Sequence, residues 1–248
     1  MLSRRLLALV LATMPFAAPA FAKDDAKDYP NRSIKIIVPF PAGGPSDVLA
    51  RIIAQKMTED WNQPVVVENR VGANTVIGAQ AVAKSPADGY TLLMAIDSTL
   101  VMNQYLYKSL PYDPIADFTP ISVVAKTMQL LIVNASSDIK SVKDLIAKQK
   151  ANPGKLNFGA GTITTQLTGV LFNKAAGTEA QLVRYNGSAQ VAQGLLTQSV
   201  DYVLDGTSAA LPLIQDGKFR ALAKFDNRPF APVPDLPLIG PASGLSGL

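Results

Sequence analysis

The sequence predicts an α/β fold with a mostly parallel sheet, on three observations. Short apolar runs alternate with amphipathic runs almost throughout the chain, which is the pattern of successive strand–helix units. Glycine-bearing turns directly follow two of the apolar runs. The 248 residues, of which 48% are hydrophobic and 17% charged, are enough for one or two domains with a substantial core.

The first 22 residues have the pattern of a Sec-type signal peptide. Arg4 and Arg5 form a positive segment, residues 6–16 are apolar, and Ala20-Phe21-Ala22 is a cleavage site followed at once by charged residues. An anchoring helix is the weaker interpretation because the apolar segment is short for a bilayer. We therefore expect cleavage after Ala22 and a mature protein that is exported and has no membrane-spanning segment.

The first elements after this segment have clear local signals. Residues 33–38 (SIKIIV) predict a buried strand. A helix is predicted over 45–60, because apolar residues recur there at helical spacing and Pro45 suits the first helical position. Further strands are predicted over 64–68 and 90–96, with short helices over 79–84 and around 100–107.

The remaining residues continue the alternation. Ser141 followed by Asp144 three residues later is typical of a capped helix start. The predicted strands cover 121–125, 129–134, 156–158, 182–185, 202–205 and 219–223, and the predicted helices cover 136–150, 164–176, 189–197 and 209–215.

Composition excludes several classes of function. The chain has no histidine and no cysteine, which rules out Ser-His-Asp triads, histidine-ligated zinc and thiolate chemistry. Its net charge of +4 falls to +2 without Arg4 and Arg5, and no basic patch indicates nucleic acid. We expect no metal and no cofactor. The composition argues against an enzyme, although carboxylate or Ser-Lys chemistry stays open.

The turn after the first strand, PFPAGG at 39–44, directly precedes a helix. Backbone N–H groups at such a place can bind an anion. Neither a Gly-Lys-Ser/Thr ending nor a G-x-G-x-x-G pattern is present, which favours a carboxylate over a phosphate. The other interpretation is a tight turn that faces only solvent. Asp47 either caps the following helix or meets a ligand ammonium.

Four further turns at the carboxyl ends of predicted strands are polar or glycine-rich. Ligands of open α/β sheets bind beyond these strand ends, so together the turns indicate a binding cleft rather than a catalytic one. A threonine that only caps its own helix is the alternative at any single position. The turns contain Ser98 and Thr99; Gly159, Ala160, Gly161, Thr162 and Thr164; Asn186, Gly187 and Ser188; and Asp205 through Ser208.

Seven segments in order resemble the Bug family, the periplasmic solute-binding receptors of tripartite tricarboxylate transporters. They run from about Tyr29 to the end of the chain: IKIIVPFPAGGPSDVLARIIA, PVVVENRVGAN, AVAKSPADGYTLLM, YLYKSLPYDPIADFTPIS, ANPGKLNFG, VRYNGSAQVAQGLLTQSVDYVLDG and ALPLIQDGKFRALA. The resemblance implies a type II periplasmic-binding-protein fold, in which two α/β lobes close on a small carboxylate. It also implies membrane permease subunits as partners, a periplasmic location and a monomer.

The resemblance places ligand contacts on the turns already identified. It points to Phe40, Pro41, Ala42, Gly43 and Gly44 in the first lobe with Ser98 and Thr99, and to residues 159–164, Asn186, Gly187 and Asp205 in the second. The implied organisation is a signal peptide over 1–22, lobe 1 over 23–122, lobe 2 over 123–218 and a return to lobe 1 over 219–248. We expect lobe 1 to be incomplete at the C-terminus, and hence low stability.

Departures from the family pattern affect the second lobe and the turn after residue 96. Gln166-Leu167 stands where His-Leu is common, Asp97 stands where small residues are usual, and a histidine usual near Asn103 is absent. The neutral second-lobe turns disfavour a tricarboxylate. A mono- or dicarboxylate or an amino acid stays open as the ligand. Other readings are a ligand sensor for a membrane signalling protein, an enzyme using Asp47, Asp97 or Asp205, and a non-functional truncated product.

Overall fold

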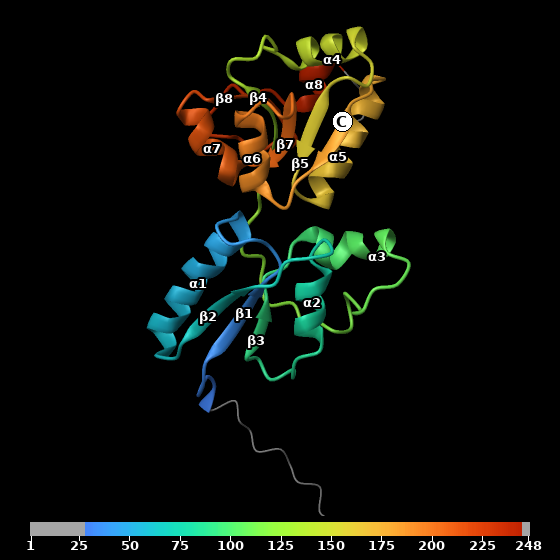
Figure 1. Ribbon diagram of the computed structural model, residues 1–248. Helices are drawn as coiled ribbons and strands as arrows, with labels where there is room; N and C mark the ends of the chain where they lie inside the picture. Colours follow the sequence, from blue (N-terminus) through green and yellow to red (C-terminus); the bar gives the residue numbers. More distant parts are fainter. Residues whose placement is uncertain (1–27, 245–248) are drawn as a thin grey trace, which may run out of the picture.

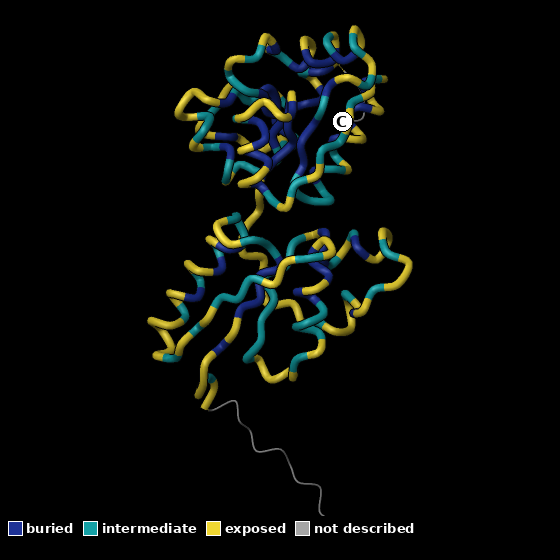
Figure 2. Tube along the Cα trace, viewed as in Figure 1, coloured by how far each residue is buried: buried dark blue, intermediate teal, exposed yellow. Residues whose placement is uncertain are grey.

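The computed structural model describes residues 28–244, which form two α/β lobes joined by one extended segment (Figure 1). The first lobe contains a three-stranded sheet in the order β2-β1-β3, and the second a five-stranded sheet in the order β6-β5-β7-β4-β8. Buried residues gather inside each lobe, whereas the edges that face each other are mostly half-buried or exposed (Figure 2). The predicted signal peptide lies outside the described residues.

The first lobe follows the predicted alternation. Strand β1 (Ile34–Val38) lies between β2 (Val65–Asn69) and β3 (Thr91–Leu93), and both pairs are parallel. The predicted strand over 90–96 is shorter in the structure, because its backbone hydrogen bonds to β1 extend only from the Tyr90 carbonyl to the Met94 amide. The helices are α1 (Pro45–Trp61), α2 (Val76–Ala83), the π-helix η2 (Ser98–Met102) and α3 (Asn103–Leu106).

The second lobe is a mixed sheet with helices on both faces. Strand β4 (Gln129–Asn134) runs antiparallel to both β7 and β8, whereas β5 runs parallel to β6 and β7. The expectation of a mostly parallel sheet thus fits the first sheet fully and the second in part. The remaining elements are α4 (Val142–Ala151), β5 (Asn157–Ala160), α5 (Ile163–Ala176), β6 (Gln181–Arg184), α6 (Ser188–Leu196), β7 (Tyr202–Gly206), α7 (Thr207–Gln215), β8 (Phe219–Lys224) and α8 (Ile239–Ser243).

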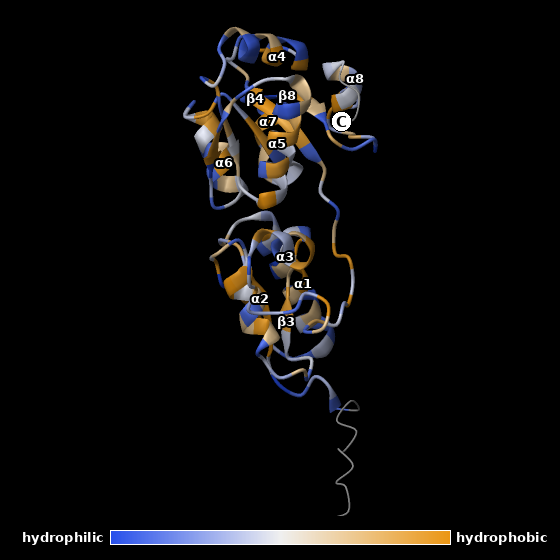
Figure 3. Ribbon diagram, turned by 90° about the vertical axis from the view of Figure 1, so that its right-hand side faces the viewer, coloured by the Kyte–Doolittle hydropathy of each residue, from blue (hydrophilic) through white to orange (hydrophobic). Residues whose placement is uncertain are grey.

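The strand predicted over 121–125 does not form. These residues belong to the extended segment between the lobes, which runs along one side of the molecule (Figure 3). Ile121 and Val123 are 79% and 75% exposed, so no strand of the described part of the chain covers them. Their β-branched side chains favour extended backbone, but a strand also needs a partner ladder.

Residues 219–244 stay with the second lobe, in contrast to the expected return to lobe 1 over 219–248. Strand β8 pairs with β4, and the amide of Lys224 donates to the carbonyl of Pro237 (2.9 Å). Helix α8, which the sequence did not predict, lies against α4. The reason is the apolar content of this segment: Leu222, Ala223 and Ile239 are buried in the core of the second lobe.

The second lobe has an apolar core on each face of its sheet. Phe158 and Tyr202 stack in one core, at 5.6 Å between ring centroids, and Leu130 and Val203 lie in the other. The Tyr202 hydroxyl donates to Asn173 Oδ1 (2.8 Å) and accepts from Gln149 Nε2 (3.0 Å). This buried polar triad ties α4, α5 and β7 together.

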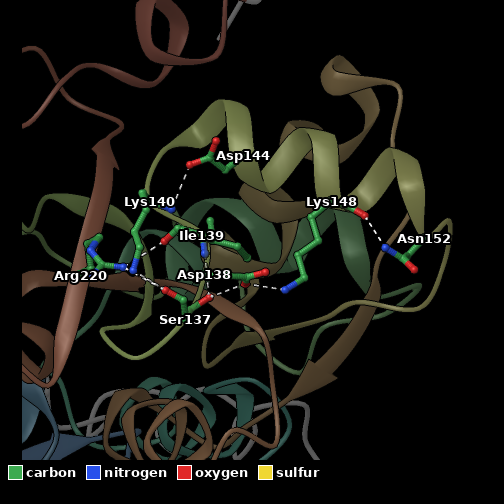
Figure 4. A network of polar contacts seen from close by, with 8 residues as sticks. All are labelled: Ser137, Asp138, Ile139, Lys140, Asp144, Lys148, Asn152 and Arg220. Atoms are coloured by element: carbon green, nitrogen blue, oxygen red, sulfur yellow. Dashed lines mark hydrogen bonds and ion pairs between the residues drawn. The ribbon is translucent and has the colours of Figure 1, made fainter.

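Arg220 fixes the connection between β4 and α4. Its guanidinium donates to the carbonyls of Ala135 (2.9 Å), Ser137 (3.3 Å) and Ile139 (3.1 Å), as Figure 4 shows in part. Ser141 accepts from the amide of Asp144 (3.2 Å). Helix α4 therefore begins after this cap, six residues later than the predicted start at 136. Within residues 28–244, no helix is both long enough and apolar enough to span a bilayer.

Candidate functional site

The PFPAGG turn leaves the carboxyl end of β1 and leads into α1, with Gly44 as the N-cap and Pro45 in the first turn. Gly43 has φ +78°, a conformation that favours glycine, and Ala42 and Gly43 are exposed. Helix α2 lies directly under the turn, because a Cβ on Gly78 would come within 2.7 Å of Pro39. The turn is thus rigidly supported and presented at the sheet edge that faces the second lobe (Figure 1).

Asp47 holds this turn in place. Its Oδ2 accepts from the Gly43 amide (2.8 Å) and from Arg51 Nε (2.9 Å). Its Oδ1 accepts from Asn69 Nδ2 (2.9 Å), which also donates to the Phe40 carbonyl (2.9 Å). The hydrogen bond from Arg51 lowers the pKa of the buried Asp47 carboxyl to about 2. Asp47 is therefore an ionised brace of the turn.

This brace changes which N–H groups can meet a ligand. The Gly43 amide is used by Asp47, and the Gly44 amide faces the Pro41 carbonyl at 3.4 Å. The first-turn amides of Ser46 and Asp47 have no intrahelical acceptor, as helix geometry requires. An anion at the start of α1 would meet these amides and the positive end of the helix dipole.

The second polar turn of the first lobe contains Asp97, Ser98 and Thr99. Asp97 Oδ1 accepts from the Ser98 amide (2.8 Å) and caps η2. Ser98 and Thr99 are 2% and 1% exposed, and Thr99 Oγ1 has no hydrogen-bond partner within the described residues. The Thr99 carbonyl accepts from the Tyr112 hydroxyl (2.7 Å), so the turn is anchored to the body of the lobe.

In the second lobe, two of the predicted turns lie against each other. A Cβ on Gly161 would come within 2.8 Å of the Gly187 carbonyl carbon, so the two backbones touch. Thr162 is the N-cap of α5 and forms a reciprocal capping box with Thr165. Gly159 and Ala160 are buried in β5 behind this turn. Gln166, the residue at a family departure, follows in the first turn of α5.

Contacts between the lobes involve Gly187 and Thr164, whose Oγ1 lies 3.4 Å from Met102 Sδ. Thr164 Oγ1 donates to Asp97 Oδ2 (2.9 Å). A Cβ on Gly187, which has φ +118°, would lie 3.9 Å from Pro41 Cδ. The PFPAGG turn and the turn at Asp97 therefore each face a glycine- or threonine-bearing turn of the second lobe.

Asp205 lies beneath the turns that face the other lobe and is not part of their exposed surface. It is 3% exposed at the end of β7, and Oδ1 accepts from Ser188 Oγ (2.7 Å). Burial raises the pKa of Asp205 to about 6, against hydrogen bonds from Ser188 and the Gly206 amide. Its carboxyl links the starts of α6 and α7, and so positions the Gly187 turn.

The structure thus separates the predicted site residues into two groups. Residues on the facing edges of the lobes are Phe40 through Gly44, Gly161, Thr162, Thr164, Asn186 and Gly187. The buried predicted residues, which lie behind them, are Ser98, Thr99, Gly159, Ala160 and Asp205. The sequence interpretation missed Asn69 and Ser188 as supports, although Asn69 ends a predicted strand and Ser188 follows Gly187. Among the described residues, no group of acidic side chains could hold a metal ion.

The comparisons with known sequences agree on one protein family. The family model described as "Tripartite tricarboxylate transporter family receptor" matches residues 49–245. Protein BugT of Bordetella pertussis is 40% identical, over 88% of this chain and 68% of that protein. A UPF0065 protein from a tcbD-tcbE intergenic region of a Pseudomonas species is 36% identical, over 98% of this chain and 72% of that protein.

Solved structures agree with the sequence comparison. Rpa4515 of R. palustris with adipate superposes with a TM-score of 0.84 at 37% identity, over 89% of this chain and 74% of that one. The periplasmic binding protein BugD gives 0.77 at 31%, over 88% and 73%. MatC of Rhodopseudomonas palustris with bound malate gives 0.76 at 27%, over 86% and 74%. These neighbours confirm the predicted two-lobe periplasmic-binding fold.

Proposed function

Because the chain belongs to the tripartite tricarboxylate transporter receptor family, we propose that it is a periplasmic receptor for a small carboxylate, which it delivers to the permease subunits of such a transporter. The observation that carries the proposal is that turns of the two lobes approach each other. Pro41 approaches Gly187, and Asp97 meets Thr164. Structural neighbours with adipate and malate bound support a carboxylate as the ligand class.

Binding would begin at the start of α1. The amides of Ser46 and Asp47 and the exposed Ala42 turn offer donors to a carboxylate, and the helix dipole adds about 0.3–1 kcal/mol. Contacts from the Gly187 turn become available only when the lobes approach. A ligand that touches both lobes therefore shifts the population toward the closed form. The mechanism needs capture and release, with no bond made or broken, as expected for a receptor.

The test is ligand-induced stabilisation of the mature chain, residues 23–248. A panel of small mono- and dicarboxylates and amino acids is screened by thermal shift, and the responders are titrated by calorimetry. We expect at least one acid to raise the melting temperature with one site per monomer. Absence of any response over the panel, in protein that melts cooperatively, would contradict the proposal. Formation of a product from a responding acid would show that the protein is an enzyme rather than a receptor.

A matched pair of variants assigns the response to the turn. Gly43 and Gly177 both have left-handed φ values, +78° and +61°, and a Cβ on either meets no atom within 4 Å. Gly177 lies at the opposite end of α5 from the cleft, as its C-cap. Gly43→Val and Gly177→Val should therefore suffer similar backbone strain, about 1–2 kcal/mol. Only Gly43→Val should lose the ligand response.

A further inference from the structure

Asp97 is an acidic side chain that is hydrogen-bonded to the opposite lobe, and within residues 28–244 no lysine or arginine forms an ion pair with it. Among the residues that the structure describes, its partners are the Ser98 amide (2.8 Å) and the Thr164 hydroxyl (2.9 Å), both neutral. The residue is exposed. By contrast, Asp47 at the neighbouring turn is neutralised by Arg51 (2.9 Å). Asp97 therefore presents an uncompensated negative charge to the cleft.

The distance to the proposed carboxylate site is short. Strands β1 and β3 are hydrogen-bonded neighbours in a parallel sheet, so their carboxyl ends lie at one edge, with strands about 4.8 Å apart. The PFPAGG turn follows β1, and Asp97 follows β3 after three further residues. A ligand of a few carbon atoms, with its carboxylate at the first turn, therefore extends to Asp97.

The Asp97 carboxylate can accept further hydrogen bonds from a cationic group of a ligand. Each carboxylate oxygen accepts one hydrogen bond, which leaves further lone pairs on both. Thr99 Oγ1, two residues away and 1% exposed, has no partner within the described part of the chain. Because Asp97 is exposed whereas Thr99 is buried, a ligand between the lobes reaches the Asp97 carboxylate and not the Thr99 hydroxyl. An ammonium, which has three donors and no acceptor, fits this carboxylate.

We infer that the receptor selects an amino carboxylate, with its carboxylate at the PFPAGG turn and its ammonium at Asp97. This inference rests on the proposed function, of which it names the ligand class. A dicarboxylate of the same length would place its second carboxylate beside Asp97, where like charges repel without screening by a nearby cation. Asp97 is thus a specificity-determining residue, and Thr164 orients it from the opposite lobe.

Ligand pairs of equal length test the inference. Adipate is compared with 6-aminohexanoate, and succinate with 4-aminobutanoate, by calorimetric titration of the mature chain. We expect the amino member of at least one pair to bind tenfold or more tightly. Asp97→Asn should lower that preference tenfold or more. Thr164→Val, which removes the hydrogen bond but keeps the charge, should retain the preference even if both ligands bind more weakly.

The outcomes separate the two proposals. Binding of the dicarboxylates as tightly as the amino acids, or an unchanged preference in a folded Asp97→Asn variant, would overturn the inference and leave the receptor function standing. No binding of either class, in protein that melts cooperatively, would remove the proposed function and the inference with it. Asp216→Asn, an exposed aspartate at the end of α7, serves as the control for nonspecific charge effects.

Discussion

Removal of the buried charge at Asp205 should stabilise the protein, and only above about pH 5. The carboxyl is 3% exposed, and burial moves its pKa from an ordinary 3.8 to about 6. Since one pH unit corresponds to about 1.36 kcal/mol, the ionised carboxylate costs the folded state about 3 kcal/mol at pH 7. Asp205→Asn removes this cost and keeps an acceptor oxygen for Ser188 Oγ.

The sign follows from proton binding. Between about pH 4 and pH 6 the folded state holds a proton at Asp205 that the unfolded state has lost. The free energy of unfolding of the natural chain therefore decreases as pH rises through this window, and the variant lacks that decrease. After about 1 kcal/mol is subtracted for an altered hydrogen bond, the expected gain is about 2 kcal/mol at pH 7, or about 4–8 °C in melting temperature.

The assay is urea unfolding of both proteins from pH 4 to pH 8, followed by circular dichroism. The difference in unfolding free energy should be near or below zero at pH 4 and level off above pH 7. Ser188→Ala removes a hydrogen bond that lowers the Asp205 pKa, so it should move the transition to higher pH. A difference that stays constant from pH 4 to pH 7 would refute the reasoning.

Three further predictions concern the turns and the core. Asp47→Asn should lower the free energy of unfolding by about 1–3 kcal/mol at pH 7 and weaken the ligand response, because the charged acceptor that holds the Gly43 amide is lost. The pKa of Asp47 is lowered to about 2, so the difference in unfolding free energy between the two proteins, measured by chemical denaturation, should vanish as pH falls from 4 toward 2. Gly161→Ala places a Cβ 2.8 Å from Gly187, so calorimetry should show lost ligand binding while the melt stays cooperative. Tyr202→Phe leaves Asn173 and Gln149 with fewer partners and should cost about 1–3 kcal/mol by urea unfolding, with ligand affinity unchanged.

Elements with local signals were predicted well. The helix predicted over 45–60 is α1 over 45–61, because Pro45, the preceding glycine and the apolar spacing all act within a few residues. Helix α8 was missed because Ile239–Ser243 contains glycine and proline and has no helical periodicity. Its position depends on contact with α4, which is distant in sequence. The strand predicted over 121–125 does not form for a similar reason, because a strand requires a neighbouring strand with which to form hydrogen bonds.

The candidate site shows the same division. The glycine turns were predictable, because a strand, a glycine pair and a helix start adjoin one another. The support that Asn69 gives to the turn was not, because Asn69 reaches the Phe40 carbonyl only through the pairing of β1 with β2. Asp205 looked like a cleft residue at a strand end. Its side chain instead points to Ser188, and a sequence pattern does not reveal which way a side chain at a strand end turns.

The contacts across the cleft bear on how binding is coupled to closure. Thr164 Oγ1 donates to Asp97 Oδ2 (2.9 Å) and lies 3.4 Å from Met102 Sδ. Because Asp97 is exposed, water competes for its carboxylate, and the hydrogen bond contributes only about 0.5–1.5 kcal/mol. Contacts this weak hold the lobes together only marginally. A charge-assisted hydrogen bond from a bound ligand contributes about 1.5–3 kcal/mol. Two such bonds made only in the closed form therefore outweigh the lobe–lobe contacts, so that the ligand, rather than the protein alone, determines the closed population.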